Sequence, residues 1–344
     1  MSLPSFVAPP GEDLPPPLHL LELLVQFVVA RAAMVITGLG LPDHMGDAAR
    51  TPEELASACG AHAPSLRRLL RLLAGAGLVA SDPSGRYRLT PVGECLRSDH
   101  PASMAPLFRM CDGPVFRVAL EVGHTVRTGE PADQVVLGDA VFDYLAKHPA
   151  EGETFNEAMT AFRRQFTGPI LMAYDFSGFS TLVDVGGGHG FFLASVLLAN
   201  PGTTGVIFDQ AHVVEGARAA VAEFGVADRC TVVGGDFFEA VPEGDGYVLS
   251  WIIHDWDDER ALAILTNVRK AIAPDGRLLL FEAVVPEGDA PGFAKVIDAF
   301  LMPLGGVERT EAEFAALLAA AGFRPHAATV AMNTVEKPGS ASIS

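Results

Sequence analysis

The sequence predicts an α/β protein in which a Rossmann-like mixed sheet follows a mainly α winged-helix domain. Three observations support this fold class. An apolar strand pattern at 181–185 stops at a cluster of glycines, further apolar runs end in acidic residues, and a helix–helix–hairpin pattern lies near the amino terminus. A strand, a glycine turn and a helix N-terminus together form the ligand-binding edge of an open parallel sheet.

Composition limits the partners that this chain can have. Its 344 residues suffice for two domains, and 42 acidic against 24 basic residues give a formal charge of −18. Such a surface repels phosphate backbones and anionic lipids, so no nucleic acid and no membrane partner is expected. The cysteines lack metal-ligand spacing, which predicts no metal and reduced thiols in a cytoplasmic protein. They are Cys59, Cys95, Cys111 and Cys230.

The amino-terminal segment contains a long apolar stretch after a proline-rich tail. Residues 1–17 lack the features of a secretory signal, and we expect a flexible tail. The apolar stretch at 18–36 contains Glu22, Gln26 and Arg31, which make it a poor membrane span. It is expected to be a buried helix, and helices that are apolar all round often pack into subunit interfaces. A homodimer is therefore predicted.

The winged-helix pattern begins at Thr51, which with Glu54 forms a capping box. A second helix is expected from Ser65, and the runs 78–80 and 86–89 flank a turn, as in a hairpin wing. Arginines on the second helix raise the alternative of a DNA-binding regulator, which the acidic charge disfavours. They are Arg67, Arg68 and Arg71. We assign residues 18–105 to a winged-helix domain that serves dimerisation.

The following segment, 106–165, reads as a helical linker that covers the substrate. Phe155, Met159 and Phe162 recur at helical spacing. One interpretation is core packing, and the other is a flat apolar pocket, since both methionine and phenylalanine serve either role.

The glycine cluster has a spacing that argues against a dinucleotide. In G-x-G-x-x-G the third glycine would fall at Phe191, whereas the chain has Gly186, Gly188 and Gly190 after Asp184. Glycines here remove the β-carbons that would keep a ligand from the backbone.

Two further predicted strands end in residues suited to a nucleoside. The run 205–208 ends at Asp209, whose carboxylate suits ribose hydroxyls. The run 231–233 leads to Asp236 and Phe237, a carboxylate and an aromatic face that suit adenine. Because parallel strands end at one edge, these side chains are expected to lie together.

The remaining strands complete the ligand domain, expected over 166–338 with a flexible tail at 339–344. The run 247–251 leads to His254, and 277–281 ends at Glu282. Glu308 lies just before a second capping box at 310–313. The segments 327–332 and 334–335 are expected to form an antiparallel edge hairpin, which makes the sheet mixed.

Taken together, these motifs resemble the class I S-adenosylmethionine-dependent small-molecule O-methyltransferases of plants and actinobacteria, the caffeic acid and carminomycin type. The likeness spans nearly the whole chain. The motifs that carry it, besides the winged helix and the glycine loop, are 155–159, 174–179, 253–256 and 305–310.

The resemblance implies S-adenosylmethionine as cofactor, an aromatic or polyketide-type small molecule as substrate, and roles for individual residues. The implied catalytic residues are His254 as general base with the flanking Glu282 and Glu308. The implied cofactor-binding residues are Asp184, Gly186, Gly188, Asp209, Asp236, Phe237 and Ser250. The implied pocket residues are Phe155, Met159, Phe162, Asp255 and Met302. Plant relatives carry lysine where this chain has Ser250, and their pocket methionine aligns with either Leu301 or Met302.

The implied chemistry is proton removal during methyl transfer. A phenol with a pKa near 10 is a poor nucleophile at neutral pH, and an imidazole can take its proton as the methyl transfers. The alternatives are an enzyme that uses the same cofactor for hydroxylation, decarboxylation or pericyclic chemistry, and the winged-helix regulator. The presence of His254 with both glutamates favours methylation.

Overall fold

The computed structural model describes residues 15–324, which divide into two units. The smaller unit comprises residues 15–117 and 148–165, and the larger comprises 118–147 and 166–324. Predicted features at 1–14 and 325–344, including the antiparallel edge hairpin, lie outside the described residues.

The smaller unit contains the predicted winged helix. Its elements are α1 (Pro16–Gly38), α2 (Leu41–Met45), α3 (Pro52–Cys59), α4 (Ala63–Gly75), β1 (Val79–Ser81), β2 (Tyr87–Leu89), α5 (Pro91–Glu94), α6 (Ala105–Met110), most of α7 (Pro114–Leu120) and the first part of α11 (Pro149–Ala173). The capping box at Thr51 and Glu54 and the β1–β2 hairpin are both confirmed. Helix α4 begins two residues earlier than expected, and it buries Leu66, Leu70 and Leu73.

Helix α1 differs from its prediction as a buried helix. Only Ala32, Ala33, Ile36 and Thr37 on it are buried, whereas Leu20 and Leu24 expose 68% and 66% of their surface. By length and composition alone, α1 is also able to cross a membrane, but core helices of soluble proteins and signal sequences pass the same test. Since its apolar residues point in all directions, one neighbouring core cannot cover them. The apolar pattern therefore marks a surface rather than a core.

The larger unit contains a five-stranded parallel sheet in the order β5-β4-β3-β6-β7. Its elements are α8 (Val122–Thr128), α9 (Asp133–Leu137), α10 (Val141–Lys147), η1 (Phe176–Gly178), β3 (Thr181–Val185), α12 (Phe191–Ala199), β4 (Thr204–Asp209), α13 (Val214–Glu223), β5 (Cys230–Gly234), β6 (Gly244–Ser250), η2 (Ile253–Asp255), α14 (Asp258–Ala271), β7 (Ile272–Phe281), α15 (Phe293–Leu301), η3 (Met302–Leu304) and α16 (Glu311–Ala320). All five strands were predicted, and every pairing among them is parallel.

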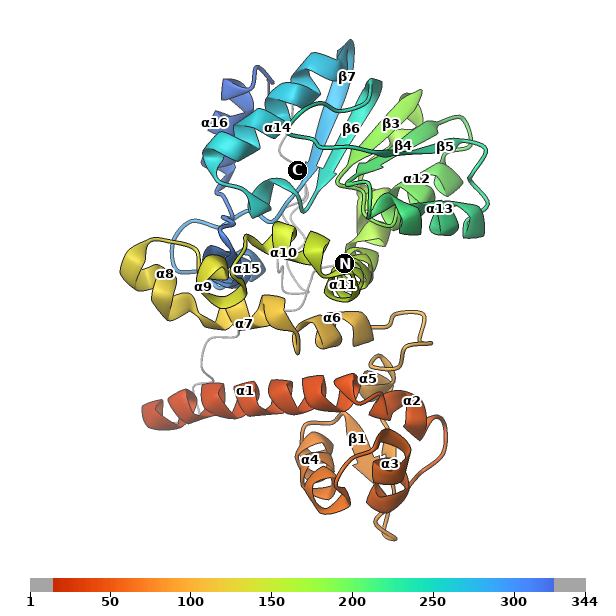
Figure 1. Cartoon of the computed structure of the whole chain (residues 1–344), viewed down its shortest axis with the longest axis vertical. Coiled ribbons are helices and arrows are strands. Elements are labelled where there is room, and N and C mark those ends of the chain that lie inside the picture. Colours follow the sequence, from red (N-terminus) through yellow and green to blue (C-terminus); the bar gives the residue numbers. More distant parts are fainter. Residues whose placement is uncertain (1–14, 325–344) are drawn as a thin grey trace, which may run out of the picture. The chain divides into compact units, whose positions relative to one another are not determined.

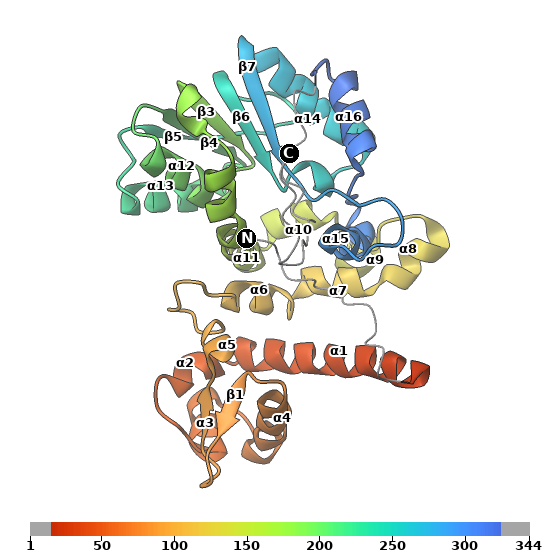
Figure 2. The ribbon, with the colours of Figure 1, turned by 180° about the vertical axis from the view of Figure 1, so that it is seen from behind.

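Both faces of this sheet are buried. Alternate residues of β3 and β6 pack with α14 and α16 on one face, as Val183 and Tyr247 do. Their neighbours pack with α12 and α13 on the other face, as Leu182 and Val248 do. Figures 1 and 2 show these helix pairs on opposite sides of the strands. Burial on both faces explains why the strands read as continuous apolar runs.

The strand order places a topological switch point beside β3. From β3 the chain proceeds outward through β4 to β5, and then returns to the other side of β3 with β6 and β7. Loops leaving β3 and β6 diverge there, and ligands of open α/β sheets bind at this position.

Candidate active site

The loop after β3 has positive φ at Gly186, Gly188 and Gly190, which glycine adopts without strain. A β-carbon at Gly186 would lie 2.3 Å from Ile252 Cδ1, and one at Gly190 would lie 2.3 Å from Ile207 Cδ1. At Gly188 it would meet nothing within 4 Å. The outer two glycines are thus required by packing inside the protein, which corrects the explanation that all three make room for a ligand. Gly188 leaves the middle of the loop open.

Asp184 lies beneath this loop. It is completely buried, and a β-carbon at Gly187 would lie 3.0 Å from its Oδ2. This placement suits a carboxylate that supports the loop. Direct contact between Asp184 and a cofactor stays a prediction.

Asp209, at the end of β4, holds the glycine loop in place. Its Oδ2 accepts a hydrogen bond from the Gly188 N–H at 2.8 Å, and its Oδ1 accepts one from the Gln210 N–H at 2.7 Å. A carboxylate at this position suits the hydroxyls of a ribose, and that contact stays a prediction.

The loop after β5 presents the predicted carboxylate and aromatic ring. Asp236 is exposed, and its Oδ1 accepts from the Phe238 N–H at 2.8 Å. Phe237 packs edge-on against Trp256, with ring centroids 5.9 Å apart. The Asn267 amide donates to the carbonyls of Phe237 and Phe238 at 3.0 and 2.8 Å. The backbone of this loop is thereby fixed while Asp236 stays open to solvent.

His254 lies in η2, four residues beyond the end of β6, and only 7% of its surface is exposed. Its Nδ1 is hydrogen-bonded to Glu308 Oε1 at 2.8 Å, and its Nε2 lies 3.5 Å from Asp255 Oδ1. A β-carbon at Gly306 would lie 2.6 Å from the His254 carbonyl oxygen, so glycine is needed where the two loops meet.

Glu282 is placed differently from the expectation that it holds the imidazole. Its Oε1 accepts from the N–H groups of Ile252 and Ile253 at 3.0 and 2.8 Å. Trp251, just before these two residues, has a φ of 57°, the one positive φ among the described non-glycine residues. The chain turns there, and the next two N–H groups meet the carboxylate at the end of β7. Of the two glutamates, Glu308 therefore bonds the ring and Glu282 bonds the loop that carries it.

The protonation of this cluster follows from its burial and charge. Burial alone lowers the pKa of His254, but Asp255, the hydrogen bond to Glu308 and the nearby Glu282 outweigh that effect and raise it to about 9. Burial also raises the pKa of Glu282 to about 7, assisted by the negative charge of Glu308. The imidazole of the free protein is therefore largely protonated at neutral pH.

The same three side chains have the spacing of a metal site. Ligand atoms of His254, Glu282 and Glu308 lie within 4.8 Å of one another. However, Nδ1 of the ring is already engaged with Glu308, and two backbone N–H groups occupy Glu282 Oε1. This set of bonds suits proton handling. Chelation of the purified protein tests metal binding at the cluster directly.

The other predicted residues are dispersed. Ser250 ends β6 and is buried, Asp255 follows His254, and Met302 begins η3 with partial exposure, whereas Leu301 is buried. The aromatic and methionine positions of α11 belong to the smaller unit, where they are partly buried, and their role in a pocket stays a prediction. They are Phe155, Met159 and Phe162.

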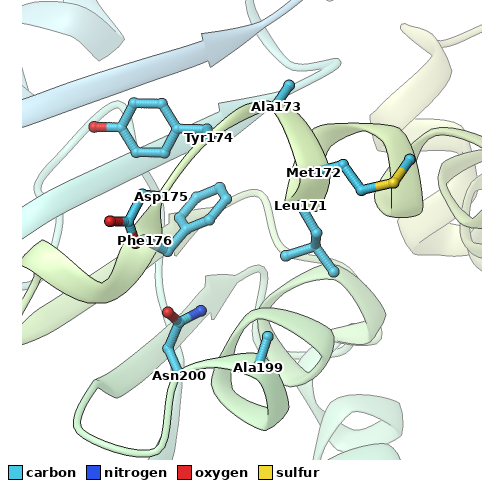
Figure 3. A pocket seen from close by; sticks show the side chains of 8 residues that line it. All are labelled: Leu171, Met172, Ala173, Tyr174, Asp175, Phe176, Ala199 and Asn200. Atoms are coloured by element: carbon cyan, nitrogen blue, oxygen red, sulfur yellow. The ribbon is translucent and has the colours of Figure 1, made fainter.

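A separate hollow of about 440 Å³ lies at the opposite, amino-terminal edge of the sheet. Figure 3 shows Tyr174, Asp175 and Phe176, which precede β3, around it together with Asn200 from the end of α12. Asp175 accepts from the Ser177 N–H. None of the predicted site residues lines this hollow.

Three residues near His254 were given no role by the sequence. The Trp251 ring lies 5.4 Å from the imidazole, Asp298 Oδ1 accepts from the Glu308 N–H at 3.0 Å, and Arg309 is 2% exposed. The positive φ of Trp251 could not be predicted from the sequence. Arg309, by contrast, adjoins Glu308 inside a recognised motif, and that neighbourhood was a usable signal.

Comparisons with known proteins agree with this fold. Residues 121–324 match the family model of an O-methyltransferase domain, and residues 21–99 match that of an O-methyltransferase dimerisation domain. A phenazine O-methyltransferase of Lysobacter antibioticus is 43% identical over 306 residues, which is 88% of this chain and 90% of the relative. A mitomycin biosynthesis 6-O-methyltransferase of Streptomyces lavendulae is 39% identical, with 86% and 85% covered.

A solved structure extends the likeness to a liganded protein. It is an O-methyltransferase from neocarzinostatin biosynthesis in complex with S-adenosylmethionine and 2-hydroxy-5-methyl naphthoic acid. It has a TM-score of 0.74 and 36% identity, and the match covers 85% of this chain and 90% of the other.

Proposed function

Since the chain belongs to the O-methyltransferase family with a dimerisation domain and is an S-adenosylmethionine-dependent enzyme, we propose that it methylates the phenolic hydroxyl of an aromatic or polyketide-type secondary metabolite, with His254 as general base. The hydrogen bond between His254 Nδ1 and the buried Glu308 carries this proposal, because it leaves Nε2 to take a proton. The homologous enzymes exclude the reading of this chain as a regulator.

The residues at the strand ends fit the cofactor. Gly188 leaves the first loop open, the Asp209 carboxylate that bonds this loop suits ribose hydroxyls, and the exposed Asp236 with Phe237 suits adenine. Ser250 at the end of β6 would add an uncharged polar contact. When bound, S-adenosylmethionine supplies an activated methyl group. The chain's own task is to hold the acceptor oxygen in line and to remove its proton.

In this mechanism His254 Nε2 accepts the hydroxyl proton, and Glu308 stabilises the resulting imidazolium through Nδ1. Glu282 fixes the backbone of the histidine loop, and its ionised form adds negative charge. Asp255, with its Oδ1 3.5 Å from Nε2, is the residue that we expect to accept a hydrogen bond from a second polar group of the substrate. Retention of this complete cluster favours methylation over the non-methylating chemistries.

Incubation with methyl-labelled cofactor and a panel of phenols and polyketides tests this function. Label in an extractable product supports the proposed function. A rate of methyl transfer that does not change after chelator treatment shows that the cluster acts without a metal ion. An altered, unlabelled product that forms while the cofactor is not consumed would favour non-methylating chemistry. A rate that falls on chelation and returns with a divalent cation would reassign the cluster to metal binding.

Replacing Asp209 with alanine is expected to raise the dissociation constant of S-adenosylmethionine about 10- to 100-fold, the equivalent of one charge-assisted hydrogen bond. Turnover at saturating cofactor should change less, because a ribose acceptor binds ground and transition states alike. Calorimetry measures the affinity. Glu239→Ala, an exposed carboxylate after β5, is the control. Unchanged cofactor affinity in Asp209→Ala would remove this residue from the site.

We also propose that the enzyme is a soluble, cytoplasmic homodimer in which a second copy covers α1. Exposed leucines along this helix support the proposal, as does the match to a dimerisation domain. Such a cover explains the apolar helix without a membrane.

The double substitution Leu20→Glu and Leu24→Glu should convert the dimer to monomers. Each buried leucine contributes about 1.5–3 kcal/mol, so the dimer dissociation constant should rise at least about 10-fold per site. Sedimentation measures the mass, and Val92→Glu, an exposed valine on α5, serves as the matched control. A double variant that keeps the dimer mass contradicts this interface.

A further inference from the structure

We propose that Arg309 is a positioning residue for the reaction proposed above: its buried guanidinium holds together the loop that carries His254 and the segment that carries Glu308. This inference rests on the proposed function of His254. It follows from where each of the five N–H donors of the guanidinium points.

The guanidinium is shut off from solvent and fully bonded. Nε and Nη2 donate to Asp258 Oδ1 at 2.9 and 2.8 Å. Nη2 also donates to the Trp256 carbonyl at 2.9 Å, and Nη1 donates to the carbonyls of Ile253 and Val307 at 3.2 and 3.3 Å. Arginine has five donors, and five bonds are present. Because an unpaired buried charge is costly, moving either loop away from the guanidinium would be unfavourable.

The backbone carbonyls that accept from Arg309 lie on both sides of His254 in the chain. Ile253 directly precedes His254, and Trp256 follows it by two residues, so both ends of η2 are held. Val307 directly precedes Glu308. The one planar group therefore fixes the two backbones whose side chains form the 2.8 Å bond between His254 and Glu308.

The backbone of Arg309 adds the segment that follows β7. Its carbonyl accepts from the Val285 N–H at 2.9 Å, and it pairs with Val284 as a parallel bridge. Val284 lies two residues beyond Glu282. Arg309 thus contacts all three segments that carry members of the cluster, although it touches none of the three side chains by a described hydrogen bond.

Lysine cannot replace this group. It keeps the charge but offers three donors from one nitrogen, so at least two of the five bonds to the loops are lost. Arg309→Lys therefore tests geometry at constant charge. Asp258→Asn is a milder second variant, because it weakens two of the bonds at a carboxylate that is 83% exposed.

Arg229 provides a matched control. Its guanidinium also donates to backbone carbonyls, those of Leu197, Asn200 and Thr203, but near the amino-terminal edge of the sheet. Arg229→Lys should lower the melting temperature and leave the catalytic cluster alone. A loss of turnover that both lysine variants share then reflects lower stability. A loss of turnover seen in Arg309→Lys alone reflects the positioning of His254 and Glu308.

The experiment compares wild type, Arg309→Lys, Asp258→Asn and Arg229→Lys in the full chain. Turnover is measured against pH, cofactor affinity by calorimetry, and the imidazole titration of His254 by NMR, with the resonance assigned from His254→Gln. For Arg309→Lys we expect kcat about 10²-fold lower, the typical effect of a displacement of about 1 Å. Cofactor affinity should stay at the wild-type value, and the His254 titration should move to lower pH because Glu308 is no longer held against Nδ1. Asp258→Asn should shift both quantities less, in the same direction.

Two results would overturn the proposal: a folded Arg309→Lys with wild-type kcat and His254 titration, or the same changes in Arg229→Lys. If Arg309→Lys does not fold, Asp258→Asn decides by the same criteria. If the wild type transfers no methyl group, the proposed function fails, while the NMR titration still tests whether Arg309 positions the pair.

Discussion

Replacing His254 with alanine is expected to lower turnover by roughly 10²–10⁴-fold while cofactor affinity stays near wild type, because only proton removal is lost. Because the wild-type rate itself rises up to the pKa of His254 at about 9, the defect should shrink only above that pH, as the acceptor hydroxyl ionises and needs no base. The measurement is turnover of one accepted phenol over a pH series, together with a melting curve. His44→Ala, an exposed histidine of the smaller unit, is the control.

The direction in which wild-type kcat/KM changes with pH follows from the protonation of this cluster. The base acts only when neutral, and the pKa of His254 in the free protein is raised to about 9. For an acceptor with a hydroxyl pKa of about 10 or more, kcat/KM should therefore rise with pH through the neutral range toward 9. A folded His254→Ala enzyme with wild-type turnover at neutral pH would end the assignment. So would a loss that stays constant above pH 9 and is accompanied by lower stability.

Much of the fold was predictable because local signals agreed with tertiary packing. The capping box at Thr51 starts α3 as expected, and the strand at 181–185 is apolar because helices cover both faces of the sheet. Helix α1 was predicted wrongly as buried, since composition reports that a surface is apolar but not what covers it. The observed strand ends differ from the predicted ones by a few residues, because each strand continues as far as its neighbour in the sheet offers hydrogen-bond partners.

The candidate site was predictable in its residue types but not in its bonds. Parallel strands end at one edge, and this puts Asp209, Asp236, His254 and Glu282 along the carboxyl edge of one sheet. The division of labour between the glutamates depends on the turn at Trp251, which directs two N–H groups to Glu282. A left-handed backbone conformation at a bulky residue is stabilised by the surrounding structure, so it cannot be predicted from the local sequence.

The role of Gly186 illustrates the same limit. A glycine before a ligand loop reads as room for the ligand, yet here the crowding atom is Ile252 Cδ1, from a residue more than sixty positions away in the chain. The loop of β3 and the turn after β6 therefore constrain each other. The glycine loop after β3 and the histidine loop after β6 therefore form one packed structure.

Neutralising Glu308 should produce the second large loss. Glu308→Gln keeps the shape and can still accept from Nδ1, but it removes the negative charge that stabilises the imidazolium. We expect kcat on its pH-independent plateau to fall by roughly 10²-fold or more, bounded by the roughly 10⁴-fold loss when a triad carboxylate is neutralised. Loss of that charge also lowers the pKa of His254, so the rising limb of kcat/KM should move from near 9 toward the ordinary histidine value of about 6.5.

The two effects oppose each other at neutral pH, because more of the variant carries a neutral base while that base is weaker. The complete profile is therefore required, and a single rate at pH 7 underestimates the change. Glu313→Gln is the matched control: its carboxylate accepts from the N–H and hydroxyl of Thr310, so it loses the same charge five residues away. It should melt at a lower temperature with an unshifted limb. A Glu308→Gln enzyme whose plateau and limb both match the wild type would show that this carboxylate does not act on the imidazole, and the base would then have to work without a partner.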